Sequence, residues 1–349
     1  MYSIGVIGDT PTARAVIKAC HQSGFNDLTW VQTHTPGATL AAHTLPANVT
    51  KVLNALDGAT ALNDYGHRPD RQQVRLARSG FLLSELPLGQ FAKDRYGAEL
   101  INIEGDCWPQ LLPWTSPPSP AATLTDLERQ YEVVIVCDEA FEAPSEPPQA
   151  THGLWHASVP FEQDTSKVNI TWVGEQYCAW QFSTPKRQHI YFSLPVGHAP
   201  SDVSWHPLLG SAVALAVHQN DFCATQSPVR EHWQTGSVVY LGSACLSFNP
   251  YLREASTTGL EDAWVLSRML ENYEEDIHDG LAAYERYRRA RARRIAKAAT
   301  ATAHQMNKSH MLARGLQHLN TALSTRFLPE IAMNRIDWFY GYDAIRGFR

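Results

Sequence analysis

Two histidines in the middle of the chain have a spacing that metal sites use. His152 and His156 lie four residues apart in the segment THGLWHASVP, and on a helix that spacing would place both imidazoles on one face. The segment reads as a strand, however, and although the pair would share a face of it, no third ligand is in view. We therefore predict no metal site.

The stretch from 238 to 270, VVYLGSACLSFNPYLREASTTGLEDAWVLSRML, reads as a buried strand, a long polar loop and an amphipathic helix. This is the layout of a cofactor-binding turn. It carries Ser243, Arg253 and Glu254 where a nucleotide cofactor would favour other residues. We find no nucleophile elbow, no phosphate loop GxxxxGK[ST] and no recoverable Ser/His/Asp arrangement.

Arginines cluster in the segment ERYRRARARRIAK. Such a run is typical of a nucleic-acid-binding stripe or of a solvated helix face, and we favour the solvated face. The formal net charge of -6 is mild and gives no electrostatic reason to expect nucleic acid or an anionic membrane. The partners we expect are a small, possibly aromatic, molecule and, left open, a protein partner or a second copy of the chain.

The composition is that of a folded globular protein. With 349 residues, of which 44% are hydrophobic and 18% charged, the chain can bury one large core or two coupled cores. Its six cysteines are scattered without a CxxC pair, which suits reduced thiols in a cytoplasm. The opening MYSIGVIGD reads as a strand, so we expect no secretion signal, no membrane span and a cytoplasmic location.

The elements that must position these residues begin with a βαβ unit. The strand YSIGVIG is followed by a helix that Thr10 can cap, Pro11 suits in its first turn and Gly24 suits at its end. A second strand, LTWVQTH, comes directly after. Strand, tight turn, helix and strand in this order predict a nucleotide-binding sheet.

An antiparallel sheet is predicted in the middle of the chain. We predict strands at residues 81 to 86 and in the apolar run YEVVIVCDE. Three aromatic-rich segments follow between 152 and 195, and they indicate the antiparallel sheet. The strand and helix pattern of the N-terminal unit then returns, with a strand at 237 to 242 and helices at 259 to 274 and 280 to 300. This order predicts an α/β fold in which a sheet domain is inserted between pieces of a nucleotide-binding domain. About half of the following aromatic residues should be core, and the others could line a substrate pocket: Trp172, Trp180, Phe182, Tyr191, Phe192 and Trp205.

In this order of elements the sequence resembles the FAD-dependent aromatic hydroxylases, the flavoprotein monooxygenases that include p-hydroxybenzoate and salicylate hydroxylases. The resemblance covers nearly the whole chain, and it implies an α/β fold, a Rossmann-like FAD-binding-type domain with an inserted antiparallel β-sheet substrate domain and a helical C-terminus. It rests on the N-terminal βαβ unit, GFLLSELPLGQFAKDRYGAE, the strand ending at Asp138, GSVVYLGSA, GLEDAWVLSRMLENY, YERYRRARARR and the closing DWFYGYDAI.

The resemblance places the family's first two cofactor motifs on changed residues. The glycines of GxGxxG, which let backbone N–H groups approach the pyrophosphate, correspond to Gly8, Thr10 and Ala13. The acidic residue that binds the adenosine ribose corresponds to Gln32.

The later motifs are changed in the same way. An arginine that the family places against the cofactor corresponds to Glu104, and the DG motif keeps Asp138 but not its glycine. In the GD motif Gly242 is kept, and the aspartate that bonds the ribityl chain is Ser243. After Pro250, the GQG that lies against the flavin begins at Arg253.

The changes fall on the residues that would touch the cofactor. Hydrogen bonds that involve charged groups contribute roughly 1.5 to 3 kcal/mol each, so losing three costs about 5 to 9 kcal/mol. Binding at about nanomolar strength would weaken to about 10 µM or worse, and Asp9 and Glu104 add repulsion if they lie near the pyrophosphate, which Arg14 or Arg253 would offset only if well placed.

We therefore expect a protein that has lost conventional FAD binding, needs no cofactor, and acts as a flavin-independent enzyme or as a binding or partner protein. The alternative is a working monooxygenase, in which the resemblance implies that NAD(P)H reduces FAD and a small aromatic substrate is hydroxylated. No catalytic residue can be named. The resemblance divides the chain into nucleotide-binding parts at 1–66, 98–150 and 236–300, substrate-domain parts at 67–97 and 151–235, and a helical segment at 301–349.

Overall fold

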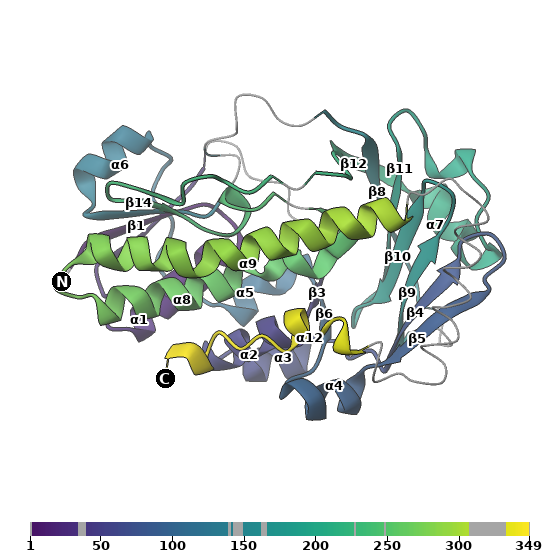
Figure 1. Ribbon diagram of the computed structural model, residues 1–349, viewed down its shortest axis with the longest axis horizontal. Helices are drawn as coiled ribbons and strands as arrows, with labels where there is room; N and C mark the ends of the chain where they lie inside the picture. The colour runs from purple at the N-terminus through teal and green to yellow at the C-terminus, as the bar shows by residue number, and fades with distance from the viewer. Residues whose placement is uncertain are drawn as a thin grey trace.

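The computed structural model describes residues 2–33, 40–138, 141, 149–161, 166–226, 228–247, 249–306 and 333–348. Its elements form a five-stranded sheet, a seven-stranded sheet and a small two-stranded sheet. Figure 1 shows the two large sheets at opposite ends of the molecule, with the long helix α9 (Ile277–Met306) running between them.

The five-stranded sheet is the predicted Rossmann-like sheet. Its strand order is β13-β14-β7-β1-β2, in which β13 is antiparallel to β14 and the other neighbours are parallel. The strands are β1 (Ile4–Ile7), β2 (Leu28–Val31), β7 (Val133–Val136), β13 (Gln234–Thr235) and β14 (Val238–Tyr240). The runs IGVI and VVIV are wholly buried, as expected for parallel strands that are covered on both faces.

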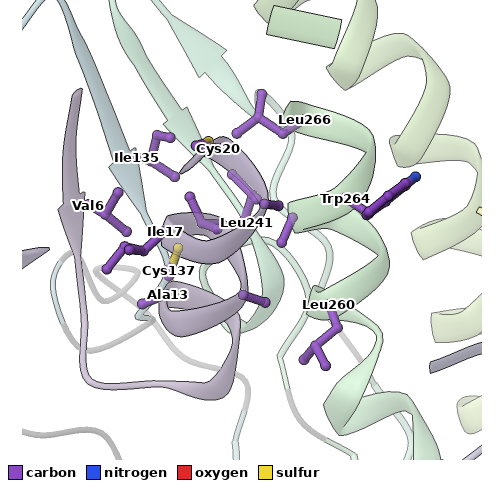
Figure 2. Close-up of a cluster of buried hydrophobic side chains, with 14 of the residues drawn as sticks. Val6, Ala13, Ile17, Cys20, Ile135, Cys137, Leu241, Leu260, Trp264 and Leu266 are labelled. Carbon is purple, nitrogen blue, oxygen red and sulfur yellow. The ribbon is translucent and has the colours of Figure 1, made fainter. Parts of the chain in front are cut away.

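Two helices cover one face of this sheet. Helix α1 (Pro11–Gln22) lies between the strands and α8 (Gly259–Asn272). Figure 2 shows the apolar side chains that join these layers, with Ile17 and Cys20 between Ile135 on the sheet side and Leu266 on α8. The buried stripe of each helix therefore fixes the position of the turn that precedes it.

The seven-stranded sheet confirms the inserted β-sheet of the prediction. Its order is β12-β8-β11-β10-β9-β4-β5, and all neighbours are antiparallel except β4 and β9. The strands are β4 (Arg71–Leu76), β5 (Leu82–Pro87), β8 (His152–Val159), β9 (Val168–Val173), β10 (Cys178–Ser183), β11 (Gln188–Pro195) and β12 (Val217–Phe222). The segment VNITWVGEQYCAWQF is two strands, because the chain turns where the Gly174 N–H donates to the Tyr177 carbonyl at 2.8 Å.

The six aromatic residues singled out in the sequence divide between the two faces of this sheet. On one face, Trp172 and Phe192 pack with Trp205 in a cluster that α7 (Gly210–Leu215) covers. On the other face, the buried cluster joins the sheet to the rest of the molecule, and it contains Trp180, Phe182 and Tyr191. Half of the set is therefore core of the outer layer, and half faces the nucleotide-binding elements.

The remaining elements connect the two large sheets. Strands β3 (Ala42–Leu45) and β6 (Ile101–Glu104) pair with each other, and Tyr191 Oη accepts a hydrogen bond from the Ala42 N–H at 3.1 Å. The other helices are α2 (Ala47–Ala55), α3 (Ala59–Tyr65), α4 (Gly89–Tyr96), α5 (Trp108–Leu111), α6 (Leu124–Gln130) and α12 (Asp337–Tyr340). Among the described segments, no helix combines the length and apolarity that crossing a membrane requires. The residue boundaries that we assign to the domains remain a prediction.

Candidate cofactor and substrate site

The turn between β1 and α1 has a backbone that only glycine suits. Gly8 has a φ of +122°, which residues with a side chain rarely adopt. A Cβ there would also lie 3.0 Å from the Cβ of Asp138. Thr10 then caps α1, its Oγ1 accepting the Ala13 N–H at 3.2 Å, and Pro11 occupies the first turn. The predicted strand, turn and helix are confirmed.

Three strand ends meet at the carbonyl of Cys137, the residue after β7. Thr10 Oγ1 donates to this oxygen at 3.1 Å, and Ser243 Oγ donates to it at 3.3 Å. Asp138 follows Cys137 and is buried. The turns after β1, β7 and β14 therefore converge at the carboxyl edge of the sheet, where open α/β sheets bind ligands.

The turn after β14 is fixed from behind by two helices. Gly242 has a φ of +57°, and its N–H donates to Asp262 Oδ2 on α8 at 3.2 Å. A Cβ on Gly242 would lie 2.6 Å from Thr12 Oγ1 on α1. Pro250 begins the short helix η6 (Pro250–Thr257), whereas the side chain of Arg253 lies outside the described residues.

The charges beside the β1 turn compensate each other. Arg14 Nη2 lies 3.9 Å from Asp9 Oδ1, and the Arg14 guanidinium lies over the Trp30 ring, 4.7 Å from its centroid. Trp30 Nε1 donates to the Gly8 carbonyl at 2.8 Å. A cation is thus held next to the turn, and Asp9 is not an isolated negative charge there.

Two other predicted positions have simple roles in the fold. Ala13 is buried in the core between α1 and the sheet (Figure 2). Gln32 follows β2, its backbone N–H donates to the Ser119 carbonyl at 3.0 Å, and its side chain is exposed. The structure therefore places Gln32 at the end of the second strand, as predicted.

Glu104 contacts the seven-stranded sheet. Its carboxylate accepts a hydrogen bond from the Thr184 hydroxyl, and His189 Nε2 lies 3.1 Å from Oε2. His189 Nδ1 lies 3.0 Å from His156 Nε2. The carboxylate of Glu104, which would repel a pyrophosphate close to it, is therefore held by hydrogen-bond partners on the seven-stranded sheet.

The Glu104, His189 and His156 cluster was missed by sequence reasoning. His156 was paired with His152, but its ring is stacked on His189, with 5.3 Å between the centroids and 12° between the planes. The sequence could have revealed this cluster. When the two aromatic-rich strands are paired, Tyr191 lies opposite His156, and His189, two residues away from Tyr191, lies on the same face. In the part of the chain that the structure describes, no three His, Cys, Asp or Glu side chains are grouped as a metal site requires.

Two arginines of the arginine-rich helix α9 are buried, so they belong neither to a solvated face nor to a binding stripe. Arg288 donates to Glu261 at 2.8 Å and to Asp262 at 2.6 Å, and Arg291 donates to Glu261 at 2.6 Å, all three contacts being buried. Burial alone would raise the pKa of Glu261, but Arg288 and Arg291, together with Asn48, hold it below its ordinary value. Our solvated-face prediction was wrong at these positions because the paired carboxylates lie on α8, far away in the sequence.

The chain has relatives among known proteins. No protein-family model matches it. It is 24% identical to the 6-hydroxynicotinate 3-monooxygenase of Pseudomonas fluorescens, over 97% of this chain and 94% of the relative. Its fold is similar to that of Klebsiella pneumoniae HpxO complexed with FAD and uric acid, with a TM-score of 0.79, 18% identity, and coverage of 97% of this chain and 96% of that chain. A salicylate hydroxylase substrate complex gives a TM-score of 0.71 at 14% identity, covering 98% of this chain and 96% of that chain.

These likenesses define a class: the chain is similar to FAD-dependent aromatic hydroxylases along nearly its whole length, and it has their fold. They also correct our prediction that the protein needs no cofactor, because the full-length relatives are monooxygenases and a structure of the same fold holds FAD. The alternative, a working FAD-dependent monooxygenase, is supported better than the flavin-independent reading.

Proposed function

We propose that this protein is an FAD-dependent monooxygenase that hydroxylates a small aromatic or heteroaromatic ring. The observation that carries the proposal is the extent of the match. Likeness to a 6-hydroxynicotinate 3-monooxygenase runs through 97% of the chain, and it includes both the parallel sheet that would bind a dinucleotide and the sheet that would cover a substrate.

The residues at the carboxyl edge of the five-stranded sheet fit the cofactor. The N-terminus of α1 follows a turn with Gly8 at φ +122° and has no acidic side chain in its first turn, so its backbone N–H groups and partial positive charge suit a pyrophosphate. Arg14 adds a cation beside this turn. Ser243 would offer a hydroxyl to the ribityl chain, and the backbone that begins at Arg253, after Pro250, would lie against the flavin, as the family resemblance implies.

The face of the seven-stranded sheet that carries Trp180 and Tyr191 is the side we assign to the substrate. Tyr251 of η6 packs against Trp180 with ring centroids 5.5 Å apart and contacts the Ser193 hydroxyl at 3.3 Å. Flat aromatic walls with a few polar atoms suit a small aromatic ligand. When bound, FAD accepts electrons from a reduced nicotinamide and enables O2 to oxygenate such a ring.

The test is to purify the protein, titrate it with FAD and follow flavin fluorescence. Oxidation of NADH and NADPH and consumption of O2 are then measured with 6-hydroxynicotinate, salicylate and urate as candidate substrates. We expect saturable FAD binding and substrate-stimulated oxidation of one nicotinamide. Absence of FAD binding at concentrations up to about 100 µM would overturn the proposal, because even three lost charged contacts leave binding on the order of 10 µM.

A matched pair of glycine variants locates the cofactor. Gly8→Ala combines an unfavourable φ with a Cβ that lies 3.0 Å from Asp138, whereas Gly24→Ala at the other end of α1 has a φ of +90° and nothing within 4 Å. Both carry backbone strain of about 1 to 3 kcal/mol. Only Gly8→Ala should lower the affinity for FAD, by about tenfold or more.

A further inference from the structure

The face of the seven-stranded sheet that we assign to the substrate has a small hollow over strands β4, β9 and β10. All the residues that line it are uncharged. Five of them carry the argument: Gln72, Asn169, Thr171, Trp180 and Phe182. The hollow is open on one side and has room for a small group only, so it suits a substituent of an aromatic ring and not the whole ring.

The pairing of the strands brings these five side chains to one face. Gln72 lies opposite Asn169, and Thr171 lies opposite Trp180. Because every second residue of a strand points to the same face, Asn169 lies beside Thr171, and Phe182 lies beside Trp180. Trp180 and Phe182 belong to the cluster that joins the sheet to the rest of the molecule. The hollow therefore lies on the face that is turned toward the nucleotide-binding elements.

Three polar groups at the hollow have no hydrogen-bond partner within the described residues. Thr171 and Trp180 are only 6% and 7% exposed, yet the Thr171 hydroxyl and the Trp180 indole N–H are unpaired and not fully enclosed. The half-buried Gln72 amide is unpaired as well. Polar groups that are so nearly buried are usually paired in folded proteins, so these three groups are free to bind a ligand.

The unpaired groups offer both donors and acceptors. The Gln72 amide and the Thr171 hydroxyl can each donate and accept, whereas the Trp180 indole only donates. Asn169 is not free, because its amide exchanges hydrogen bonds with that of Asn102 at 2.9 and 3.3 Å. A carboxamide or a ring lactam carries an N–H beside a C=O, so it would satisfy donors and acceptors together. A carboxylate only accepts, and it would leave the carbonyl oxygen of Gln72 unpaired.

A negative charge lies behind one wall of the hollow. The ring of Phe182 is stacked with that of His189, with 5.9 Å between the centroids. On its other side, His189 Nε2 lies 3.1 Å from Glu104 Oε2. The Glu104 carboxylate would therefore repel an anion in the hollow.

The cations of the neighbouring strand β4 belong to the opposite face of the sheet. Arg71 and Arg75 alternate with Gln72 along the strand. Arg71 Nη1 lies 3.6 Å from Glu85 Oε2, and Arg75 Nε donates to Gln73 Oε1 at 2.8 Å. A carboxylate in the hollow would thus lose its water without gaining a cation, which costs more free energy than two or three neutral hydrogen bonds return.

We propose that this hollow is a specificity subsite, which binds an uncharged substituent of the substrate ring, a carboxamide or lactam, in preference to a carboxylate. Thr171 and Gln72 are the residues that determine this preference. The inference rests on the proposed function, because it names the class of ring that the monooxygenase would accept. Two of the candidate substrates, 6-hydroxynicotinate and salicylate, are carboxylates, so we expect their amides to bind more tightly.

The first test compares these acids with their amides, which have nearly the same shape. The pairs are 6-hydroxynicotinate with 6-hydroxynicotinamide and salicylate with salicylamide. Each compound is titrated into the purified protein at pH 7 by isothermal calorimetry, with and without FAD. In each pair that binds, we expect the amide to have an affinity about tenfold higher or more. Equal or tighter binding of either acid, or no binding of any compound up to about 10 mM, would overturn the inference.

Two variants test the residues that line the hollow. Thr171→Val keeps the shape of the side chain but removes the hydroxyl, so the affinity for the amide should fall about three- to tenfold. Gln72→Arg adds a cation, so the affinity for the acid should rise about tenfold or more and the preference should reverse. An unchanged affinity in either variant refutes the role of that residue.

The controls place the same changes elsewhere. Thr235→Val removes an exposed hydroxyl from β13 of the five-stranded sheet, and Gln219→Arg adds a cation on the exposed edge strand β12. Both should leave all the affinities unchanged. Circular dichroism of each variant separates a lost contact from a lost fold, and Gln72→Arg tests for a gain of binding that misfolding cannot imitate.

The outcomes of the two proposals can be told apart. Uptake of FAD together with equal or tighter binding of an acid refutes the subsite and leaves the proposed function standing. Absence of FAD uptake refutes the proposed function, and the titrations made without FAD then decide the subsite by themselves.

Discussion

Glu261→Gln should be among the most destabilising conservative changes in the chain. Glu261 is fully buried on α8 and accepts hydrogen bonds from Arg291 Nε at 2.6 Å, Arg291 Nη2 at 2.8 Å and Arg288 Nη2 at 2.8 Å. The substitution removes the charge while keeping the volume. Arg288 then keeps its contact with Asp262, but Arg291 loses the charge of the carboxylate that it contacts through two nitrogens. Breaking a buried ion pair in this way costs about 3–5 kcal/mol.

The expected change in melting temperature follows from the length of the chain. An unfolding entropy of about 2.1 cal/mol/K per residue gives about 0.7 kcal/mol/K for 349 residues. A loss of about 3–5 kcal/mol should therefore lower Tm by about 4–7 °C. The measurement is thermal unfolding followed by circular dichroism at pH 7, together with urea unfolding.

The matched control is Glu271→Gln on the same helix. Glu271 pairs with Arg268 at 2.6 Å, but its side chain is 45% exposed, so the loss should be about 0–1 kcal/mol. If the two variants unfold within about 1 °C of each other, the ion network between α8 and α9 does not stabilise the fold as we argue.

Four further predictions concern stability. Wild-type stability should fall steeply below about pH 4.5, the ordinary pKa of a glutamate, because the lowered pKa of Glu261 means that the unfolded chain binds the proton first. Acid unfolding followed by fluorescence should show that the stability of Glu261→Gln depends less on pH than that of the wild type. Between pH 6.5 and 4, stability should also fall because the pKa of His156 is lowered; His156→Gln should flatten this part of a Tm-against-pH curve, and parallel curves would contradict it. Thr10→Ala should cost about 1 kcal/mol in urea unfolding through loss of the α1 cap, and Thr10→Gly only a few tenths. Trp30→Phe should cost about 0.5–1.5 kcal/mol, because it removes the hydrogen bond to the Gly8 carbonyl, and a neutral result would show that this bond is replaced by water.

The parallel core was predictable from local sequence alone. The runs IGVI and VVIV are apolar throughout. Thr10 caps a helix and Pro11 lies in its first turn, while Gly24 marks where the helix ends. Each of these signals acts over a few residues, so neighbours in space matter little. The inserted sheet was predictable for the same reason, from its alternating aromatic segments.

The polar contacts were not predictable in this way. Glu261 and Arg288 are 27 positions apart, and Glu104 and His189 are 85 apart. The sequence pattern shows a row of arginines or a lone histidine, but it does not show which carboxylate of another element faces them. The arginine-rich segment was therefore assigned to solvent, and Glu104 was assigned a repulsive role.

The same limitation explains how counting motif residues led to our wrong prediction that the protein needs no cofactor. The sum of about 5–9 kcal/mol treats every replaced side chain as a lost contact and every new acid as an unpaired charge. In the structure, Asp9 lies 3.9 Å from Arg14, and Glu104 is held by Thr184 and His189. The backbone of the Gly8 turn and the N-terminus of α1 are unaffected by these replacements, and such backbone groups bind anions whatever side chains surround them. A substitution at a motif position thus has a cost that depends on the partner that the new side chain meets in the fold.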